Sequence, residues 1–170
     1  MRTKDTPWKR VEMVAGLLVK NFEKKKPSLL LGLRLDGVVA DLVVSPGGHI
    51  EENDMGPITA CSREVKEETG LEPHNGRRVA ELHVRIQKPR LKIRVHIILF
   101  TKWSGRLKNR TSEFGWLKFI KFSEIPWNKI APGDKGWMED VLTKRKRRLV
   151  HISCGKNRKD VLSVRVRPLC

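Results

Sequence analysis

Three glutamates, Glu64, Glu67 and Glu68, occupy positions i, i+3 and i+4 of a segment with helical periodicity. Their side chains therefore share one face of the predicted helix. Crowded carboxylates repel one another, and this repulsion destabilises a helix unless a cation offsets it. Mg²⁺ suits this role because it prefers oxygen ligands and leaves room for substrate phosphates. The spacing therefore predicts a magnesium site, with Mn²⁺ as an alternative ion.

The helix that carries these acids is expected to cover residues 57–69. Gly70 follows it, at the place where a left-handed glycine commonly ends a helix. The face opposite the glutamates holds Ile58, Cys61 and Val65. This apolar stripe would anchor the helix on a hydrophobic core.

The segment from Pro46 to Leu71 resembles the signature of the Nudix hydrolases. It starts with a double glycine, and the later part of the signature is matched at every defined position: Arg63, Glu64, Val65, Glu67, Glu68, Gly70 and Leu71. Asp54 stands where the family has Glu, and 55–57 reads as a one-residue insertion. An ordinary exposed helix with Glu and Arg pairs is the alternative, and so many matched positions disfavour it. The expected Nudix box covers about 47–71.

The resemblance implies a set of metal ligands within this box. The carboxylates of Glu64, Glu67 and Glu68 would bind the ion, and the carbonyl of Gly48 would be a fourth ligand. Arg63 cannot act as a base, and its expected role is to hold the carboxylates in register through a fork-shaped ion pair.

The family often uses one further acid, from a loop across the site, as a base or ligand. Glu113 is the best candidate by position, and an exposed loop carboxylate is the equally weighted alternative. The general base is therefore left open between Glu64 and Glu113. The expected catalytic residues are Arg63, Glu64, Glu67 and Glu113.

Outside the box, the chain is similar to the MutT-like oxidised-purine nucleoside triphosphatases, the 8-oxo-dGTPase type. The likeness covers 32–48 and several segments between 125 and the C-terminal hairpin. Where those enzymes have a purine-binding Asn, a first recognition Asp and a stacking Trp, this chain has Val44, Gly133 and Ala131. Losing polar groups from a base pocket relaxes its selectivity.

Three residues are expected to bind substrate: Arg34, Asp134 and Trp137. Arg34 aligns with a substrate-side Lys of those enzymes, although a surface Arg at a strand end explains it nearly as well. Asp134 would accept a hydrogen bond from a base edge, or would act as a helix N-cap. Trp137 would line the base pocket, although a helical Trp is more often part of a core.

Length and composition predict one soluble globular domain over 1–170. No apolar run is long enough to cross a bilayer, and the N-terminus lacks the apolar segment of a secretory signal. The three cysteines have no paired spacing, so reduced thiols and a cytoplasmic location are expected. No protein partner can be predicted from the sequence.

The charge is strongly basic: 36 Lys and Arg against 19 Asp and Glu give a net charge of +17. Residues 144–170 hold many of these basic side chains against a single acid, Asp160. A solvated, soluble face is the simplest interpretation. Nucleotide phosphates or a nucleic-acid backbone are the partners that would use such a charge.

Strand-like and helical segments alternate in a pattern typical of an α/β protein. We expect a Nudix α/β/α sandwich, a central mixed β-sheet between helices. The strands of this sheet are expected at 11–20, 28–34, 78–86, 92–103, 116–122, 148–153 and 161–167, with a further strand or buried loop at 38–45. The segment 103–112 reads as a loop, and 134–147 as a second helix. Val95, Ile97 and Leu99 share one face of their strand, and Ile98 and Phe100 the other.

The leading functional hypothesis is a Mg²⁺-dependent nucleoside triphosphate pyrophosphohydrolase that releases a nucleoside monophosphate and pyrophosphate. Oxidised or other non-standard purine nucleotides are its expected substrates. One alternative is removal of diphosphate from RNA 5′ ends or caps. Another is a catalytically silent, nucleic-acid-binding Nudix domain, which the complete carboxylate set disfavours.

Overall fold

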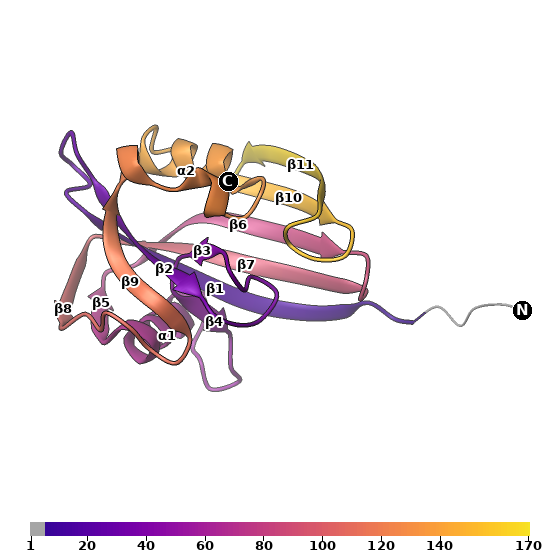
Figure 1. Cartoon of the computed structure of the whole chain (residues 1–170), viewed down its shortest axis with the longest axis horizontal. Coiled ribbons are helices and arrows are strands. Elements are labelled where there is room, and N and C mark those ends of the chain that lie inside the picture. The colour runs from indigo at the N-terminus through magenta and orange to yellow at the C-terminus, as the bar shows by residue number, and fades with distance from the viewer. Residues whose placement is uncertain (1–5) are drawn as a thin grey trace, which may run out of the picture.

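The computed structural model describes residues 6–170, and Figure 1 shows their arrangement. The chain forms strands, two α-helices and two short 3₁₀ turns. In chain order these are β1 Lys9–Lys20, β2 Ser28–Arg34, β3 Val43–Val44, β4 Gly47–His49, α1 Pro57–Thr69, β5 Leu71–His74, β6 Arg77–Ile86, β7 Leu91–Phe100, β8 Lys102–Gly105, β9 Phe114–Lys121, η1 Phe122–Glu124, η2 Trp127–Lys129, α2 Asp134–Leu142, β10 Arg148–Cys154 and β11 Val161–Pro168.

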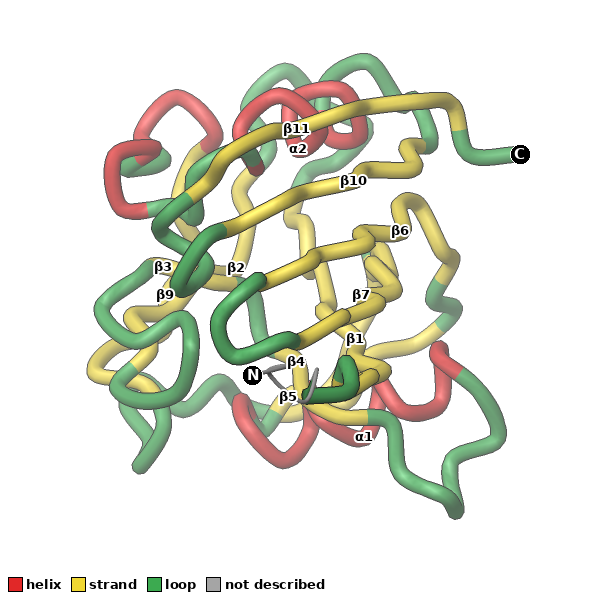
Figure 2. Tube along the Cα trace, turned by 90° about the vertical axis from the view of Figure 1, so that its right-hand side faces the viewer, coloured by secondary structure: helices red, strands yellow, loops and turns green. Residues whose placement is uncertain are grey.

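A nine-stranded mixed sheet forms the centre of the molecule, with the order β11-β10-β6-β7-β1-β2-β3. The long strand β1 connects its two parts, because it pairs in parallel with β7 and antiparallel with β2 and β4. Strand β9 pairs with β2, and β5 and β8 form a separate two-stranded ribbon. Figure 2 shows β11, β10, β6, β7 and β1 side by side.

The sheet buries an apolar layer on each of its faces. In β7, Ile97 and Leu99 pack into the cluster that contains the α2 residues. Ile98 and Phe100 point the other way and pack with the buried residues of α1. The predicted division of this strand and the α/β/α layering are therefore confirmed. In Figure 1 the two helices lie on opposite sides of the sheet.

Helix α1 has the predicted bounds and ends at Gly70, whose φ of 79° is in the left-handed region. Cys61 and Val65 are buried against the sheet as expected. The close approach is possible because Gly16 lies beneath them, where a Cβ would meet Val65 Cγ2 at 2.8 Å. The prediction for Ile58 is wrong, since its side chain is 43% exposed. It belongs to the first turn, before the helix reaches the sheet.

The other differences concern where elements end. Helix α2 stops at Leu142 rather than Arg147, because Thr143 donates back to the carbonyl of Glu139 and Arg145 turns to a φ of 55°. The apolar run 92–103 breaks at Thr101 into β7 and β8. Strand β8 leaves the main sheet to pair with β5, in a segment expected to be partly loop. Within 38–45, only the two residues of β3 are strand.

Two further expectations bear on the chain as a whole. Among residues 6–170, neither helix is long and apolar enough to cross a membrane. The three cysteines, Cys61, Cys154 and Cys170, are free. Cys61 lies on the buried face of α1, as predicted.

Candidate active site

The glycine pair of β4 brings the main chain against the acidic face of α1. A Cβ at Gly47 would collide with the carbonyl of Val14 in the neighbouring strand. A Cβ at Gly48 would collide with the carboxylate of Glu64. Gly47 is therefore required by the neighbouring backbone, and Gly48 lets the Glu64 carboxylate lie directly against the backbone of the turn.

Glu68 is buried, with 6% of its surface exposed, although it is ionisable. Its Oε2 accepts a hydrogen bond from the backbone N–H of Gly47 at 3.0 Å. Its Oε1 accepts one from Arg34 Nη1 at 3.2 Å, and the same nitrogen lies 3.2 Å from Glu113 Oε2. Burial, together with the neighbouring Glu113 carboxyl, raises the pKa of Glu68 to about 8. A cation at this point would relieve the crowding of the two acids.

Arg63 contacts the other acids of this region. The sequence predicts that it holds the glutamates through a fork-shaped ion pair. Its Nε and Nη2 bind both oxygens of Asp54, at 3.0 and 2.9 Å. Its Nη1 donates to Glu64 Oε1 at 3.0 Å and to Glu67 Oε2 at 3.3 Å. The fork itself is therefore directed at Asp54, and a single nitrogen bridges the two glutamates. Asp54 occupies the family's Glu position, and the hydrogen bonds from Arg63 lower its pKa.

Glu64 and Glu67 differ in their exposure. Glu64 borders the central cavity and its side chain is 13% exposed, so burial raises its pKa. The side chain of Glu67 is 60% exposed. Glu64 therefore faces the cavity, while Glu67 is exposed beside Arg63.

The donor set fits an open magnesium site rather than a closed one. Within residues 6–170, no three Asp, Glu, His or Cys side chains converge into a ready metal cluster. Glu64, Glu68 and Gly48 nevertheless border one cavity. Magnesium is commonly bound by one or two carboxylates, with water and substrate phosphates completing its coordination. Glu64, Glu68 and Gly48 fit that requirement.

The cavity has a volume of about 610 Å³ and runs from this acidic cluster to α2. Apolar side chains from β1 and β7 form part of its wall. Arg34, Glu113, Asp134 and Trp137 all line it, so every residue predicted to bind substrate borders the same space as the acids. The volume is typical of a site for a small molecule.

Asp134 does not cap α2, so that alternative is wrong. The N-cap is Gly133, and Asp134 is the first helical residue. Asp134 Oδ1 accepts hydrogen bonds from the indole N–H of Trp137, at 2.9 Å, and from Arg158. Oδ2 has no protein donor among residues 6–170. Burial raises the pKa of Asp134, and the guanidinium of Arg158 opposes that rise.

Trp137 serves both roles considered for it. It is 3% exposed and belongs to the core cluster of α2, and it also lines the cavity. Of the three departures from the oxidised-purine enzymes, Val44 and Ala131 line the cavity. At Gly133 a Cβ would lie 2.6 Å from Val164 Cγ2, and its φ of 89° favours glycine.

Arg158 is the site residue that sequence reasoning missed. In the sequence it is one of many charges in the basic C-terminal segment. In the structure it is 6% exposed, donates to the carbonyl of Pro132 at 2.6 Å and binds Asp134. No local signal marks it, because only the fold brings the loop between β10 and β11 to the start of α2.

The sequence of residues 11–141 matches the NUDIX domain model, which covers most of the chain. The chain belongs to the Nudix family. It is therefore a Nudix hydrolase, a class of enzyme that cleaves diphosphate linkages in nucleotide-type substrates and typically uses divalent metal ions. A search of curated proteins gave no match.

Solved structures of MutT proteins have the same fold. The MutT protein of Bacillus halodurans is 20% identical, with a TM-score of 0.77 over 94% of this chain and 99% of that chain. The MutT protein of Methanosarcina mazei is 16% identical, with a TM-score of 0.68 over 84% and 99%. A MutT Nudix hydrolase of Burkholderia pseudomallei is 16% identical, with a TM-score of 0.67 over 78% and 98%. At these identities the likeness establishes the fold.

Proposed function

We propose that this Nudix hydrolase cleaves nucleoside triphosphates to a nucleoside monophosphate and pyrophosphate, with Mg²⁺ as its cofactor. The observation that carries the proposal is the continuity of the cavity. It joins the acidic end of α1, suited to metal and phosphates, to the polar cluster of Asp134, Trp137 and Arg158, suited to a base. An apolar wall between them fits the uncharged faces of a nucleoside.

The residues at the acidic end have distinct roles in this proposal. Glu64, Glu67, Glu68 and the Gly48 carbonyl would hold the ion, which would supply charge neutralisation on the phosphates and acidify water. Arg63 keeps Glu64 and Glu67 in register through its bridging nitrogen. The fold positions these groups before the reaction. Little reorganisation of the site is therefore needed when negative charge develops on the phosphates in the transition state.

Arg34 and Glu113 form the opposite wall of the phosphate end. Arg34 lies between Glu68 and Glu113 and lines the cavity, where its guanidinium would bind a phosphate oxygen. Glu113, 42% exposed at its side chain, has room to approach water. Glu64 and Glu113 remain the two candidates for the general base.

Asp134 supports recognition of a base that presents an N–H donor. Its Oδ1 is occupied by Trp137 and Arg158, which fixes the carboxylate, and Oδ2 is left to accept. Guanine-type edges carry such donors, and oxidised or other non-standard purine nucleotides are the first substrates to test. Val44 and Ala131 make the pocket less polar than that of the oxidised-purine enzymes, so weaker discrimination between bases is expected.

The test is incubation with a panel of nucleotides and Mg²⁺, followed by identification of the products. A monophosphate and pyrophosphate are expected from small triphosphates, and Glu67→Gln should abolish their formation. Release of inorganic phosphate alone, or equal turnover by Glu67→Gln, would contradict the proposed reaction.

A second candidate function is removal of diphosphate from RNA 5′ ends or caps. The net charge of +17 favours it, because an RNA backbone is attracted by such a surface. Turnover restricted to triphosphorylated or capped RNA would identify this activity. RNA binding without any turnover would instead identify a silent binding module, against which the complete carboxylate set argues.

A further inference from the structure

One face of the sheet is left open beside α1. In β6, Leu82, Val84 and Ile86 point toward the cavity and α2. Because side chains alternate along a strand, His83 and Arg85 point to the opposite face. Helix α1 covers that face only near the end of β7, around Ile98 and Phe100. No helix of residues 6–170 covers the remainder of the face.

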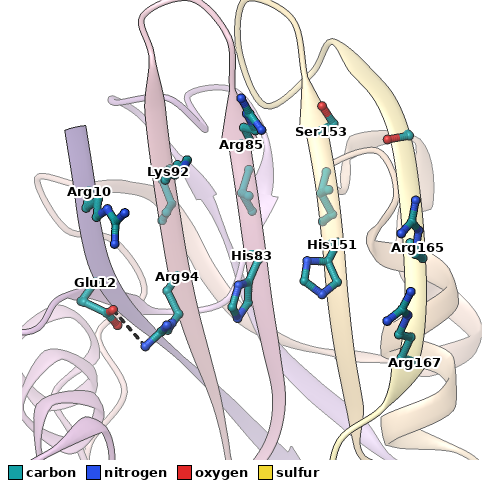
Figure 3. Close-up of a pocket in the computed structure, with 14 residues that line it drawn as sticks. Arg10, Glu12, His83, Arg85, Lys92, Arg94, His151, Ser153, Arg165 and Arg167 are labelled. Atoms are coloured by element: carbon teal, nitrogen blue, oxygen red, sulfur yellow. Dashed lines mark ion pairs between the residues drawn. The ribbon is translucent and has the colours of Figure 1, made fainter. Parts of the chain in front are cut away.

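Two rows of polar and basic residues cross this open face in register. The first row is Arg10, Lys92, Arg85, Ser153 and Ser163, from five adjacent strands. The second row is Glu12, Arg94, His83, His151 and Arg165. Arg167 lies two residues beyond Arg165 on β11. Figure 3 shows these side chains on one surface, which we call the cationic groove.

The cations of the groove are mostly without acidic partners. Arg94 pairs with Glu12 at 3.4 Å and with Glu81 at 3.5 Å, and His83 Nε2 lies 2.6 Å from Glu81 Oε1. Arg10, Arg85, Lys92, Arg165 and Arg167 make no ion pair with another described residue, in contrast to Arg34 and Arg158, which line the cavity and are paired with acids. Burial and the nearby His83, Arg167 and Arg165 lower the pKa of His151. Uncompensated positive charge of this density attracts a polyanion.

Two aromatic features give the groove a stacking capacity. The His83 and His151 rings lie side by side, with centroids 5.0 Å apart, in the middle of the second row. At the other end, Trp8 holds two of the cations in place, with the Arg85 guanidinium 4.2 Å and Lys92 Nζ 5.5 Å from its ring centroid. Histidine rings and guanidinium planes are surfaces on which unpaired bases stack.

The shape of the groove favours a flexible chain. It is a hollow of about 630 Å³ that opens to solvent, so a flexible chain can follow its floor. It lies on the face of the sheet rather than along an open edge, where a peptide would add as a strand. In a single-stranded nucleic acid, the phosphates would pair with the cations and the exposed bases would stack on the histidine rings.

We propose that the cationic groove binds single-stranded nucleic acid, with phosphates on the arginine and lysine side chains and bases against His83 and His151. The groove is formed by the side chains that point away from the catalytic cavity. A bound strand therefore leaves that cavity free, and the groove would hold the enzyme on nucleic acid while it acts on a separate substrate. The inference does not depend on which nucleotide is cleaved.

The test is fluorescence anisotropy with a labelled single-stranded RNA of about twelve nucleotides, within the range of single-strand sites. Its 5′ end is a hydroxyl, so that it cannot be a substrate. Arg85→Gln/Lys92→Gln/Arg165→Gln is compared with Lys24→Gln/Lys25→Gln/Lys26→Gln, which removes equal charge from the exposed loop between β1 and β2. Unchanged unfolding midpoints verify that both variants fold.

We expect the groove variant to bind RNA at least ten-fold more weakly than the loop variant at the same salt concentration. The slope of log affinity against log salt should fall by about 2, since each lost phosphate contact contributes about 0.7 for single strands. Equal weakening by both variants would overturn the proposal, as would failure of the unaltered protein to bind RNA.

The stacking component is tested separately with His83→Ala/His151→Ala. This variant should lose affinity for RNA and keep its affinity for inorganic polyphosphate of equal charge. Equal affinity of the unaltered groove for RNA, poly-glutamate and polyphosphate would show that charge alone is recognised and would overturn a nucleic-acid site. Preferential binding to anionic lipid vesicles would overturn it as well.

Discussion

The two faces of one sheet use the same strands for opposite purposes. In β6 and β7, Val84 and Ile93 belong to the cavity face, while Arg85 and Lys92, one residue away, stand in the cationic groove. On the cavity face, the mostly buried side chains of Arg158 and Asp134 pair with each other. In the groove most cations are exposed and have no acidic partner.

This difference shows how a period of two separates two environments along a single chain. A buried ion must be paired, because desolvation is otherwise too costly. An exposed cation needs no partner and remains available to a ligand. The buried ion pair on the cavity face is therefore typical of a preorganised catalytic site. The unpaired cations on the other face are typical of an open binding surface. Four changes test this contrast.

The largest effect is expected from Glu64→Gln, which keeps the shape of the side chain and removes its charge. Nucleotide turnover should fall about 10²–10⁴-fold, the usual contribution of such a group, while RNA affinity is unchanged. Steady-state kinetics with excess Mg²⁺ measure the nucleotide turnover, and fluorescence anisotropy measures the RNA affinity.

Glu72→Gln is the matched control, since its side chain is 54% exposed and pairs only with Lys66. If both variants turn over nucleotide at the same rate, Glu64 does not take part in the reaction. Glu113→Gln in the same assay tests the second candidate for the general base. A loss of turnover equal to that of Glu64→Gln would indicate that both acids are required.

The second effect is on stability. Arg158→Met retains the apolar stem and leaves Asp134 buried without its ion-pair partner. The free energy of unfolding should fall by about 3–5 kcal/mol, as for a broken buried pair. Denaturant unfolding measures it, and Arg165→Met in the groove should cost less than about 0.5 kcal/mol.

The double variant Asp134→Asn/Arg158→Met should recover most of that loss, because no unpaired charge is left buried. If Arg158→Met and Arg165→Met have the same free energy of unfolding, the ion pair on the cavity face does not contribute more to stability than an unpaired arginine in the groove.

The third effect concerns the glycine turn. Gly48→Ala places a methyl group against the Glu64 carboxylate, which must then move. Turnover should fall about 10–100-fold, since a displacement of about 1 Å in a catalytic group has that consequence. Gly136→Ala is the control, because a Cβ there meets nothing within 4 Å and alanine favours a helix. A fall of equal size in both variants would contradict a special role for Gly48.

Much of the fold and the acidic end of the site follow from local sequence. The spacing of Glu64, Glu67 and Glu68 and the Gly70 cap depend on contacts within one helix, so α1 was predicted with its observed bounds. The alternation of β7 likewise reveals its two buried faces. Ile58 was misjudged, because helical periodicity does not say where along the helix the sheet begins.

The base end of the cavity could not be predicted in the same way. Arg158 meets Asp134 only when the hairpin of β10 and β11 folds beside α2, a contact between residues 24 positions apart. The cationic groove is harder still, since its rows combine five strands from both ends of the chain. The net charge of the sequence indicates a basic surface. Only the register of the paired strands shows that the basic side chains of the groove share one face of the sheet.

The smallest effect is expected from the groove variant in the nucleotide assay. Arg85→Gln/Lys92→Gln/Arg165→Gln removes three charges, yet kcat/KM for a nucleoside triphosphate should change less than about two-fold at physiological salt, where the screening length is about 8 Å. The substituted side chains point away from the cavity, so only their long-range field reaches the substrate. A larger effect that disappears in high salt would indicate steering by that field. A ten-fold loss that persists in high salt would show that groove and cavity form one site.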